Sequence, residues 1–142
     1  MTKFYAEDIY DMIRVGFIGL GHNGMGHIEA HWRVGKSEVV ALCDINPERL
    51  EGASKRFGIQ RTYRSAEELC AQADIEAISV NTGDPFHKEP FLMAIEHGKH
   101  VFVEKPLANS VEQVPAALVF RRSGGGGEWI FQSRGVSDDE RE

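Results

Sequence analysis

A chain of 142 residues with 42% hydrophobic and 27% charged side chains can bury the core of one ordinary domain, but it cannot hold two full domains. The net charge of −6, without a basic block or a basic-aromatic run, argues against nucleic acids and anionic membrane surfaces as partners. The first residues lack an apolar signal-peptide core and no stretch reaches transmembrane length, so a cytoplasmic protein is expected.

Residues 1–12 are expected to form an N-terminal extension that packs as an arm, because three apolar side chains recur there at helical spacing: Tyr5, Ile9 and Met12. The first predicted strand, Ile13 to Ile18, runs into a glycine-rich turn of the pattern G-x-G-x-x-G, Gly19 to Gly24. A helix follows from about Asn23 to Val34, and its inner face is expected to carry Ile28, His31 and Trp32. A second strand, Glu38 to Cys43, ends at Asp44, 20 positions beyond the last glycine. This order of strand, turn, helix, strand and acidic residue is typical of a dinucleotide-binding unit.

Each glycine of the turn is expected to have its own role. Gly19 allows the tight turn, Gly21 lacks the Cβ that would keep the backbone away from a pyrophosphate, and Gly24 lets the helix pack closely. The pyrophosphate would lie on the amides at the start of the helix, where the helix dipole favours negative charge. The predicted cofactor-binding residues of this turn are therefore Gly19, Leu20, Gly21, His22, Asn23 and Gly24. The alternative is a glycine-rich turn that binds nothing.

Asp44 is expected to decide which cofactor binds. A carboxylate at the end of the second strand can accept hydrogen bonds from both hydroxyls of the adenosine ribose and would repel a 2′-phosphate, so NAD is favoured over NADP. Arg49, five residues on, and Arg33, near the end of the first helix, leave the use of both cofactors open. The alternative for Asp44 is to cap the helix that opens at Pro47, a role that Asn46 fits better.

The later segments continue to alternate between helices and apolar strands. The predicted helices are Pro47 to Phe57, the segment from the Ser65 capping box to about Gln72, and Phe86 to Glu96; the predicted strands are 60–63, 75–81 and 100–103. The strands are nearly continuous apolar runs, which indicates parallel strands covered on both faces. We therefore predict an α/β fold, a doubly wound parallel sheet of the NAD(P)-binding Rossmann type, over residues 13–120. The two cysteines, Cys43 and Cys70, fall within predicted elements and are expected to be buried reduced thiols, and no metal site is predicted.

Two further segments follow predicted strands: Asn81-Thr82-Gly83-Asp84-Pro85-Phe86-His87, and Gly98 to Pro106 with the sequence G-K-H-V-F-V-E-K-P. Together with the glycine turn, these motifs resemble the Gfo/Idh/MocA family, which comprises the glucose-fructose oxidoreductases, inositol 2-dehydrogenases and rhizopine-catabolism dehydrogenases. The resemblance covers about residues 13–112. Gly83 stands where the family usually has proline, which is expected to loosen this loop.

The resemblance implies an NAD(P)-dependent oxidoreductase that transfers a hydride between nicotinamide and a sugar, a polyol or a related hydroxy compound. It implies that Gly19, Gly21, Gly24 and Asp44 bind the cofactor, and that further cofactor contacts come from Asn81, Thr82, His87, Glu104 and Lys105. It also implies a catalytic role for Lys105, whose ammonium could stabilise oxyanion charge on the substrate and relay a proton. On the residues alone, Lys105 could instead form a surface pair with Glu104, and His87 could cap or orient the start of a helix.

The C-terminal part departs from the family. Pro115 interrupts a helix that begins near Ser110, and nothing resembles the family's substrate domain. Residues 121–142 form a Gly-rich and charged tail that is expected to be flexible. Within it, residues 129–131 could add one strand. These features suggest a frameshifted or truncated reading of a longer gene.

The second functional hypothesis is therefore a non-catalytic NAD-binding module or remnant that needs a partner chain. The sequence leaves open whether copies of the chain form a homo-oligomer. A methyltransferase-like nucleotide binder fits less well, because Glu104-Lys105-Pro106 would have no role in it.

Overall fold

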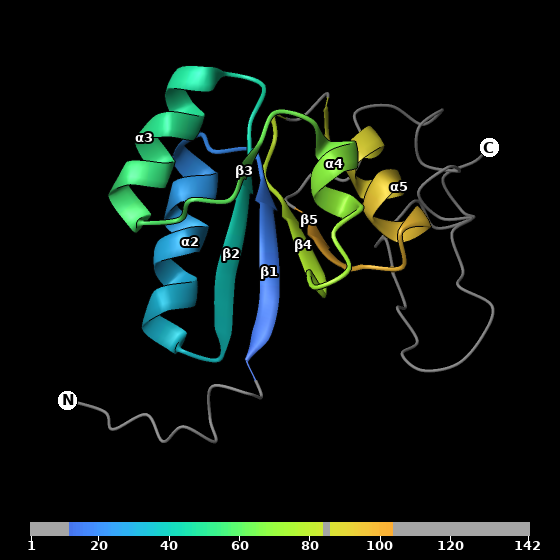
Figure 1. The fold of residues 1–142 in the computed structure, drawn as a ribbon, viewed down its shortest axis with the longest axis horizontal. Coiled ribbons are helices and arrows are strands. Elements are labelled where there is room, and N and C mark those ends of the chain that lie inside the picture. The colour runs from blue at the N-terminus through green and yellow to red at the C-terminus, as the bar shows by residue number, and fades with distance from the viewer. Residues whose placement is uncertain (1–11, 84–85, 104–142) are drawn as a thin grey trace, which may run out of the picture.

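The computed structural model describes residues 12–83 and 86–103, and these form one parallel sheet between two layers of helices (Figure 1). In chain order the elements are β1 (Ile13–Ile18), α2 (His22–Val34), β2 (Ser37–Cys43), α3 (Pro47–Phe57), β3 (Thr62–Tyr63), α4 (Ala66–Cys70), β4 (Ala77–Val80), α5 (Lys88–Glu96) and β5 (His100–Val103). This alternation confirms the α/β fold that the apolar runs predict.

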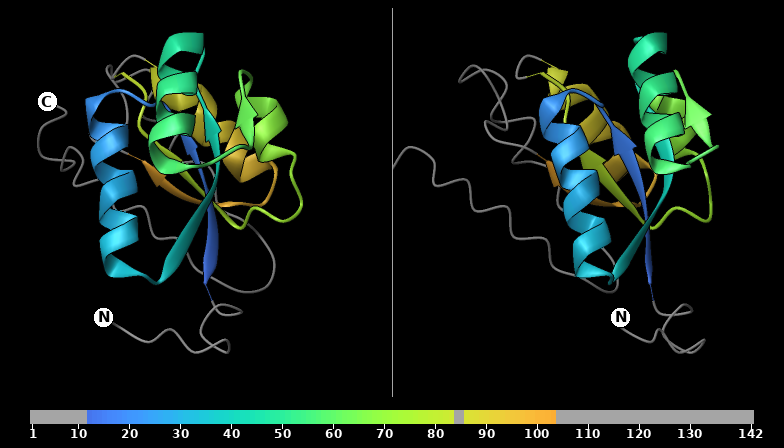
Figure 2. Two further views of the ribbon diagram at one scale, coloured as in Figure 1. Left: turned by 60° about the vertical axis from the view of Figure 1, so that its left-hand side comes forward. Right: turned by 90° about the vertical axis from the view of Figure 1, so that its left-hand side faces the viewer.

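The strands lie in the order β3-β2-β1-β4-β5 and all their pairings are parallel. Helices α2 and α3 cover one face of the sheet and α4 and α5 the other, as the turned views also show (Figure 2). The chain leaves β1 toward β2 on one side and returns to β4 on the other. The sheet is therefore doubly wound, and its order reverses between β1 and β4, which is where ligands bind in such folds.

Each face of the sheet has its own apolar core. Phe17 and Leu42 are buried against Ile28 of α2 on one face, and Ile78 and Val80 belong to the core beneath α4 and α5 on the other. The prediction that Trp32 lies on the inner face of its helix is wrong, because its side chain is 55% exposed. Ile28 is fully buried and His31 packs edge-on against Phe17, whereas Trp32 lies one residue further round the helix and contacts Phe57 of α3.

Local sequence signals fix several helix ends. The side chain of Asn46 accepts hydrogen bonds from the amides of Glu48 and Arg49, so Asn46 is the N-cap of α3 as predicted. Ser65 accepts from the amide of Glu68 and caps α4. Gly58 ends α3 with a φ of +68°, a conformation that glycine adopts readily.

The bounds of β1, α3 and β5 agree with those predicted, and the other elements differ by a few residues at their ends. Strand β3 has only two residues, because it pairs at the edge of the sheet through Thr62 and Tyr63 alone. Helix α5 begins at Lys88 and not at Phe86, whose amide instead donates to the carbonyl of Gly83 in a turn. Strand β4 begins at Ala77, since the Ile75 amide closes a turn onto Gln72.

Both cysteines are buried and free, as predicted. Burial raises the pKa of the Cys43 thiol to about 12 and that of Cys70 to about 11. Among the described residues, no group of His, Cys, Asp and Glu side chains could hold a metal ion. None of the described helices is long and apolar enough to cross a membrane.

Several predictions fall outside the described residues. These are the N-terminal arm at 1–11, the roles of Glu104 and Lys105, the helix from Ser110, the strand at 129–131 and the tail at 121–142.

Candidate functional site

The turn after β1 is held against the end of β4. Gly19 has a φ of +93°, and a Cβ added there would lie 2.5 Å from the carbonyl carbon of Asn81. Neighbouring backbone bonds fix the same corner: the Gly19 amide donates to the carbonyl of Cys43 at 2.9 Å, and the Asn81 amide donates to that of Ile18 at 2.7 Å. Only glycine satisfies both the conformation and the close approach, so Gly19 has the turn-forming role that the sequence predicts.

Gly24 and Gly21 differ in their surroundings. A Cβ added at Gly24 would lie 2.1 Å from the carbonyl oxygen of Gly19, so Gly24 lets α2 pack directly on the turn. At Gly21, no heavy atom of the described residues, apart from its neighbours along the chain and in α2, lies within 4 Å of the position that a Cβ would take. Gly21 therefore faces open space, and nothing in the protein's own packing there requires a glycine.

The start of α2 has no cap from the side chains that the structure describes. Gly21 is its N-cap residue and its first turn carries no acidic residue. His22 and Asn23, its first two residues, are exposed. Because the first amides of a helix lack intrahelical partners, this end of α2 is suited to bind an anion that reaches the open side of Gly21.

Asp44 is buried and joins the end of β2 to the glycine turn. Its Oδ2 accepts a hydrogen bond from the Leu20 amide at 2.9 Å, and its Oδ1 accepts from the Asn46 amide at 2.8 Å and from Nη2 of Arg49 at 3.1 Å. The side chain of Asp44 is only 4% exposed, whereas that of Arg49 is 51% exposed. Asp44 thus helps to position the turn, a role that its place in the sequence did not reveal.

These contacts limit what Asp44 can offer to a ribose. A carboxylate has about four acceptor positions, and Leu20, Asn46 and Arg49 occupy three of them. The expectation that Asp44 accepts from both ribose hydroxyls therefore requires Arg49 to move aside. Arg33, the other arginine considered for a 2′-phosphate, is in the last turn of α2, at the opposite end of the helix from the glycine turn.

Two buried polar atoms after β4 lack partners among the described residues. They are Oδ1 of Asn81 and Oγ1 of Thr82. The side-chain nitrogen of Asn81 does have a partner, since Nδ2 donates to Oγ of Ser79 at 2.9 Å. A buried polar atom without a partner costs about 1–3 kcal/mol, so these two oxygens are suited to form hydrogen bonds with a bound polar group.

His87 is buried and braces the same loop. Its Nε2 lies 2.6 Å from the carbonyl oxygen of Thr82, and because a carbonyl only accepts, Nε2 carries the proton. The side chain makes no cap bond to the start of α5. His87 therefore braces the Thr82 loop and does not cap α5. Its contact with a cofactor stays a prediction.

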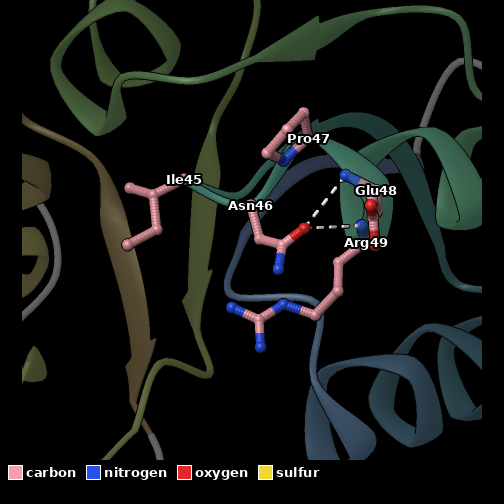
Figure 3. A pocket seen from close by; sticks show the side chains of 5 residues that line it. All are labelled: Ile45, Asn46, Pro47, Glu48 and Arg49. Atoms are coloured by element: carbon pink, nitrogen blue, oxygen red, sulfur yellow. Dashed lines mark hydrogen bonds between the residues drawn. The ribbon is translucent and has the colours of Figure 1, made fainter.

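An open pocket of about 430 Å³ lies beside Asp44, lined by Ile45, Asn46, Pro47, Glu48 and Arg49 (Figure 3). The side chain of Ile45 is 79% exposed. Nη2 of Arg64 donates to the carbonyl oxygen of Ile45 at 3.0 Å. Sequence reasoning missed Arg64 and Ser79, although Ser79 shares a strand face with Asn81 at the spacing i, i+2.

The predicted site residues within the described part gather at one edge of the sheet. Gly19 to Gly24 follow β1, Asp44 follows β2, and Asn81, Thr82 and His87 follow β4. The arrangement fits a dinucleotide: donors for a pyrophosphate at α2, a carboxylate and a pocket toward β2, and unsatisfied polar atoms toward β4.

Comparisons with known proteins agree with this geometry. Residues 13–123 match the Gfo/Idh/MocA family, described as an oxidoreductase family with an NAD-binding Rossmann fold. A glycosyl hydrolase family 109 protein of Bacteroides fragilis is 36% identical over 117 residues, which cover 76% of this chain and 25% of that protein. Inositol 2-dehydrogenase 3 of Saccharopolyspora erythraea is 43% identical over 101 residues, covering 70% of this chain and 30% of that protein.

A solved structure is similar to this chain in both sequence and fold. Myo-inositol dehydrogenase from Lactobacillus casei, crystallised with NAD(H) and myo-inositol, is 34% identical with a TM-score of 0.70, covering 73% of this chain and 31% of that one. The chain thus spans between a quarter and a third of the length of the proteins it matches.

Proposed function

Because the chain belongs to the Gfo/Idh/MocA family of oxidoreductases, we propose that it binds NAD and serves hydride transfer between nicotinamide C4 and a hydroxyl-bearing carbon of a sugar or polyol. The observation that carries the proposal is the contact between Asp44 and the Leu20 amide, because it joins the two parts of the predicted cofactor site in one buried hydrogen bond. The relatives that match include inositol 2-dehydrogenases, which supports a polyol or sugar as substrate.

Each part of the site would have a separate task. The amides at the start of α2 would bind the pyrophosphate across the open side of Gly21. Asp44 would accept from the adenosine ribose, and its charge favours NAD over NADP. Asn81 and Thr82 would offer their unsatisfied oxygens on the nicotinamide side, while His87 holds their loop.

Lys105 completes the proposal as the catalytic residue. It follows β5, the neighbour of β4, so its expected position is next to the nicotinamide side of the crevice. A bound NAD would supply the hydride acceptor at nicotinamide C4. The neutral amine of Lys105 would take up the proton of the substrate hydroxyl, and the ammonium so formed would stabilise the oxyanion charge on the substrate. Glu104 precedes it in the same motif and stays a proposed cofactor contact.

Two other functions are weaker proposals. A non-catalytic NAD-binding module is not favoured, since the matched relatives carry enzyme names. Glycoside cleavage is suggested by the match to glycosyl hydrolase family 109 proteins. Release of p-nitrophenol from p-nitrophenyl glycosides would detect that activity, and NAD-linked polyol oxidation would detect the dehydrogenase.

The test of cofactor binding is a titration of the chain with NADH and NADPH, followed by fluorescence or calorimetry. We expect NADH to bind more tightly than NADPH. Asp44→Ala should weaken NADH binding and relax the preference, because it removes the acceptor for the ribose and the charge that repels a 2′-phosphate. An Asp44→Ala protein that keeps both the NADH affinity and the cofactor preference of the unmodified chain would contradict the assignment of Asp44.

A further inference from the structure

We propose that Arg49 sets the cofactor selectivity of this chain by competing with the adenosine ribose for Asp44 and by binding a 2′-phosphate when it is released. The inference rests on the proposed function, since it concerns the adenosine half of the same dinucleotide site.

The first step is the competition for one oxygen. Arg49 donates to Oδ1 of Asp44 at 3.1 Å, beside the bond from the Asn46 amide, while the Leu20 amide occupies one position on Oδ2. Only about one of the four acceptor positions of the carboxylate is left. A ribose that offers two hydroxyls therefore has to displace Arg49, and the displaced bond lowers the affinity for NADH.

The second step is the mobility of the guanidinium. Backbone and capping bonds hold the loop itself: the Asp44 amide donates to the carbonyl of Tyr63, Arg64 donates to that of Ile45, and Asn46 caps α3. The side chain of Arg49 is instead half exposed and turns back along the loop at the rim of the pocket (Figure 3). Rotation of this one side chain is therefore enough to free one acceptor position of Oδ1, while the bond from the Asn46 amide and the backbone stay in place.

The third step is what the released group can bind. A guanidinium has five N–H donors in a planar fork that matches the oxygens of a phosphate. A 2′-phosphate on a ribose held at Asp44 would lie at the rim where Arg49 stands. Arg49 also offsets the negative charge of Asp44, which would otherwise repel that phosphate. Arg49 thus weakens NADH binding and strengthens NADPH binding. It therefore reduces the preference for NADH over NADPH that Asp44 alone would impose.

The test compares Arg49→Met with Arg56→Met in the full chain, titrated with NADH and NADPH. Arg56 is a matched control, because it is on the same helix, is 54% exposed and also pairs with a carboxylate, that of Glu29. We expect Arg49→Met to weaken NADPH binding by about tenfold or more and to leave NADH binding equal or tighter. Arg56→Met should change neither affinity by more than about twofold.

Two additional measurements make the result independent of folding. Thermal unfolding reports whether Arg49→Met stays folded, and Arg49→Lys keeps the charge but loses the fork, so its loss of NADPH binding should be smaller. Competition by adenosine 2′,5′-bisphosphate and by 5′-AMP isolates the adenosine half, and only the bisphosphate should lose affinity in Arg49→Met. If NADH binds but both cofactors weaken equally in Arg49→Met, the inference is overturned and the proposed function stands. If neither cofactor binds the unmodified chain, both are overturned.

Discussion

Single residues at the carboxyl edge of the sheet divide into those that build the site and those that leave room in it. Gly19 builds it, because its φ of +93° and its contact with Asn81 belong to the fold. Gly21 leaves room, because in the part of the chain that the structure describes only its own chain neighbours lie close to the position of an added Cβ. The motif predicts a different role for each of the two glycines. The structure agrees with the turn-forming role of Gly19, and the approach of a pyrophosphate to Gly21 stays a prediction.

Substitution of the two glycines should separate these roles. We expect Gly19→Ala to lower the unfolding midpoint strongly, because a side chain there is both strained and in conflict with backbone atoms of Asn81 and Thr82. Gly21→Ala should leave the midpoint within about 2 °C, yet weaken NADH binding, because the new methyl group would stand where the pyrophosphate has to approach. Thermal melts and NADH titrations of both variants check this. A Gly21→Ala protein that binds NADH as tightly as the unmodified chain would refute the placement of the pyrophosphate.

At the scale of elements, ion pairs tie the amino ends of the strands together. Asp74, in the turn before β4, accepts from Nη1 and Nη2 of Arg61 at 2.6 and 3.0 Å and from Nη2 of Arg14 at 2.9 Å. Hydrogen bonds from Arg61, supported by Arg14, hold the pKa of the Asp74 carboxyl well below its usual range. Because this pKa is lower in the folded than in the unfolded state, the contribution to stability is complete above the unfolded value near 4. It is lost as the pH falls below that value.

We therefore expect Asp74→Asn to destabilise the protein at neutral pH and to have less effect in acid. The carboxylate is 47% exposed, so the loss at pH 7 should be only about 1 kcal/mol, or a few degrees in the unfolding midpoint. Melts between about pH 7 and about pH 2 should show the two midpoints converging. Glu51→Gln, which removes an exposed pair with Lys55 within α3, is the control and should have a smaller effect. If Asp74→Asn lowers the stability by the same amount at every pH, the change in side-chain shape, and not the loss of charge, causes the destabilisation.

The elements could be predicted from the sequence where local patterns decide them. The apolar runs predict β1 and β5 with correct bounds, although no residue of β5 is fully buried, and the Asn46-Pro47 pair predicts the start of α3. The apolar pattern of α2 could not predict the side on which Trp32 packs, because Trp32 contacts Phe57, which belongs to another helix, α3. Lys99 is similar: it belongs to the G-K-H-V motif, yet its ammonium donates to the carbonyl oxygens of Gln72 and Ile75 and so anchors the turn before β4.

The candidate site, too, could be predicted from the sequence only in part. Its members could be predicted because the ends of parallel strands β1, β2 and β4 must meet at one edge. Their partners could not, because the hydrogen bond from the Leu20 amide to Asp44 and the ion pair of Asp44 with Arg49 depend on how the turns approach each other in space. The unsatisfied oxygens of Asn81 and Thr82 are likewise visible only once their neighbours are placed.

At the scale of the whole molecule, the described residues would provide one wall of the pocket that the proposed function requires. Hydride transfer requires a substrate carbon held near nicotinamide C4, with water excluded and an acid-base group in reach. Correct positioning alone can supply up to about 7–11 kcal/mol of the reduction in barrier. The chain matches only between a quarter and a third of the length of its relatives, and that part is their NAD-binding fold.

We therefore expect a protein of these 142 residues to bind NADH and yet to oxidise no polyol or sugar above background, as followed by NADH absorbance. The same residues joined to the remaining part of a relative such as inositol 2-dehydrogenase should be active, and Lys105→Ala should remove most of that activity while NADH still binds, because the lysine would act on the substrate. Turnover by the 142 residues alone would contradict the expectation of inactivity. A second copy of the chain, closing the crevice over Lys105, would then be the explanation to test by measuring whether activity rises with the square of protein concentration.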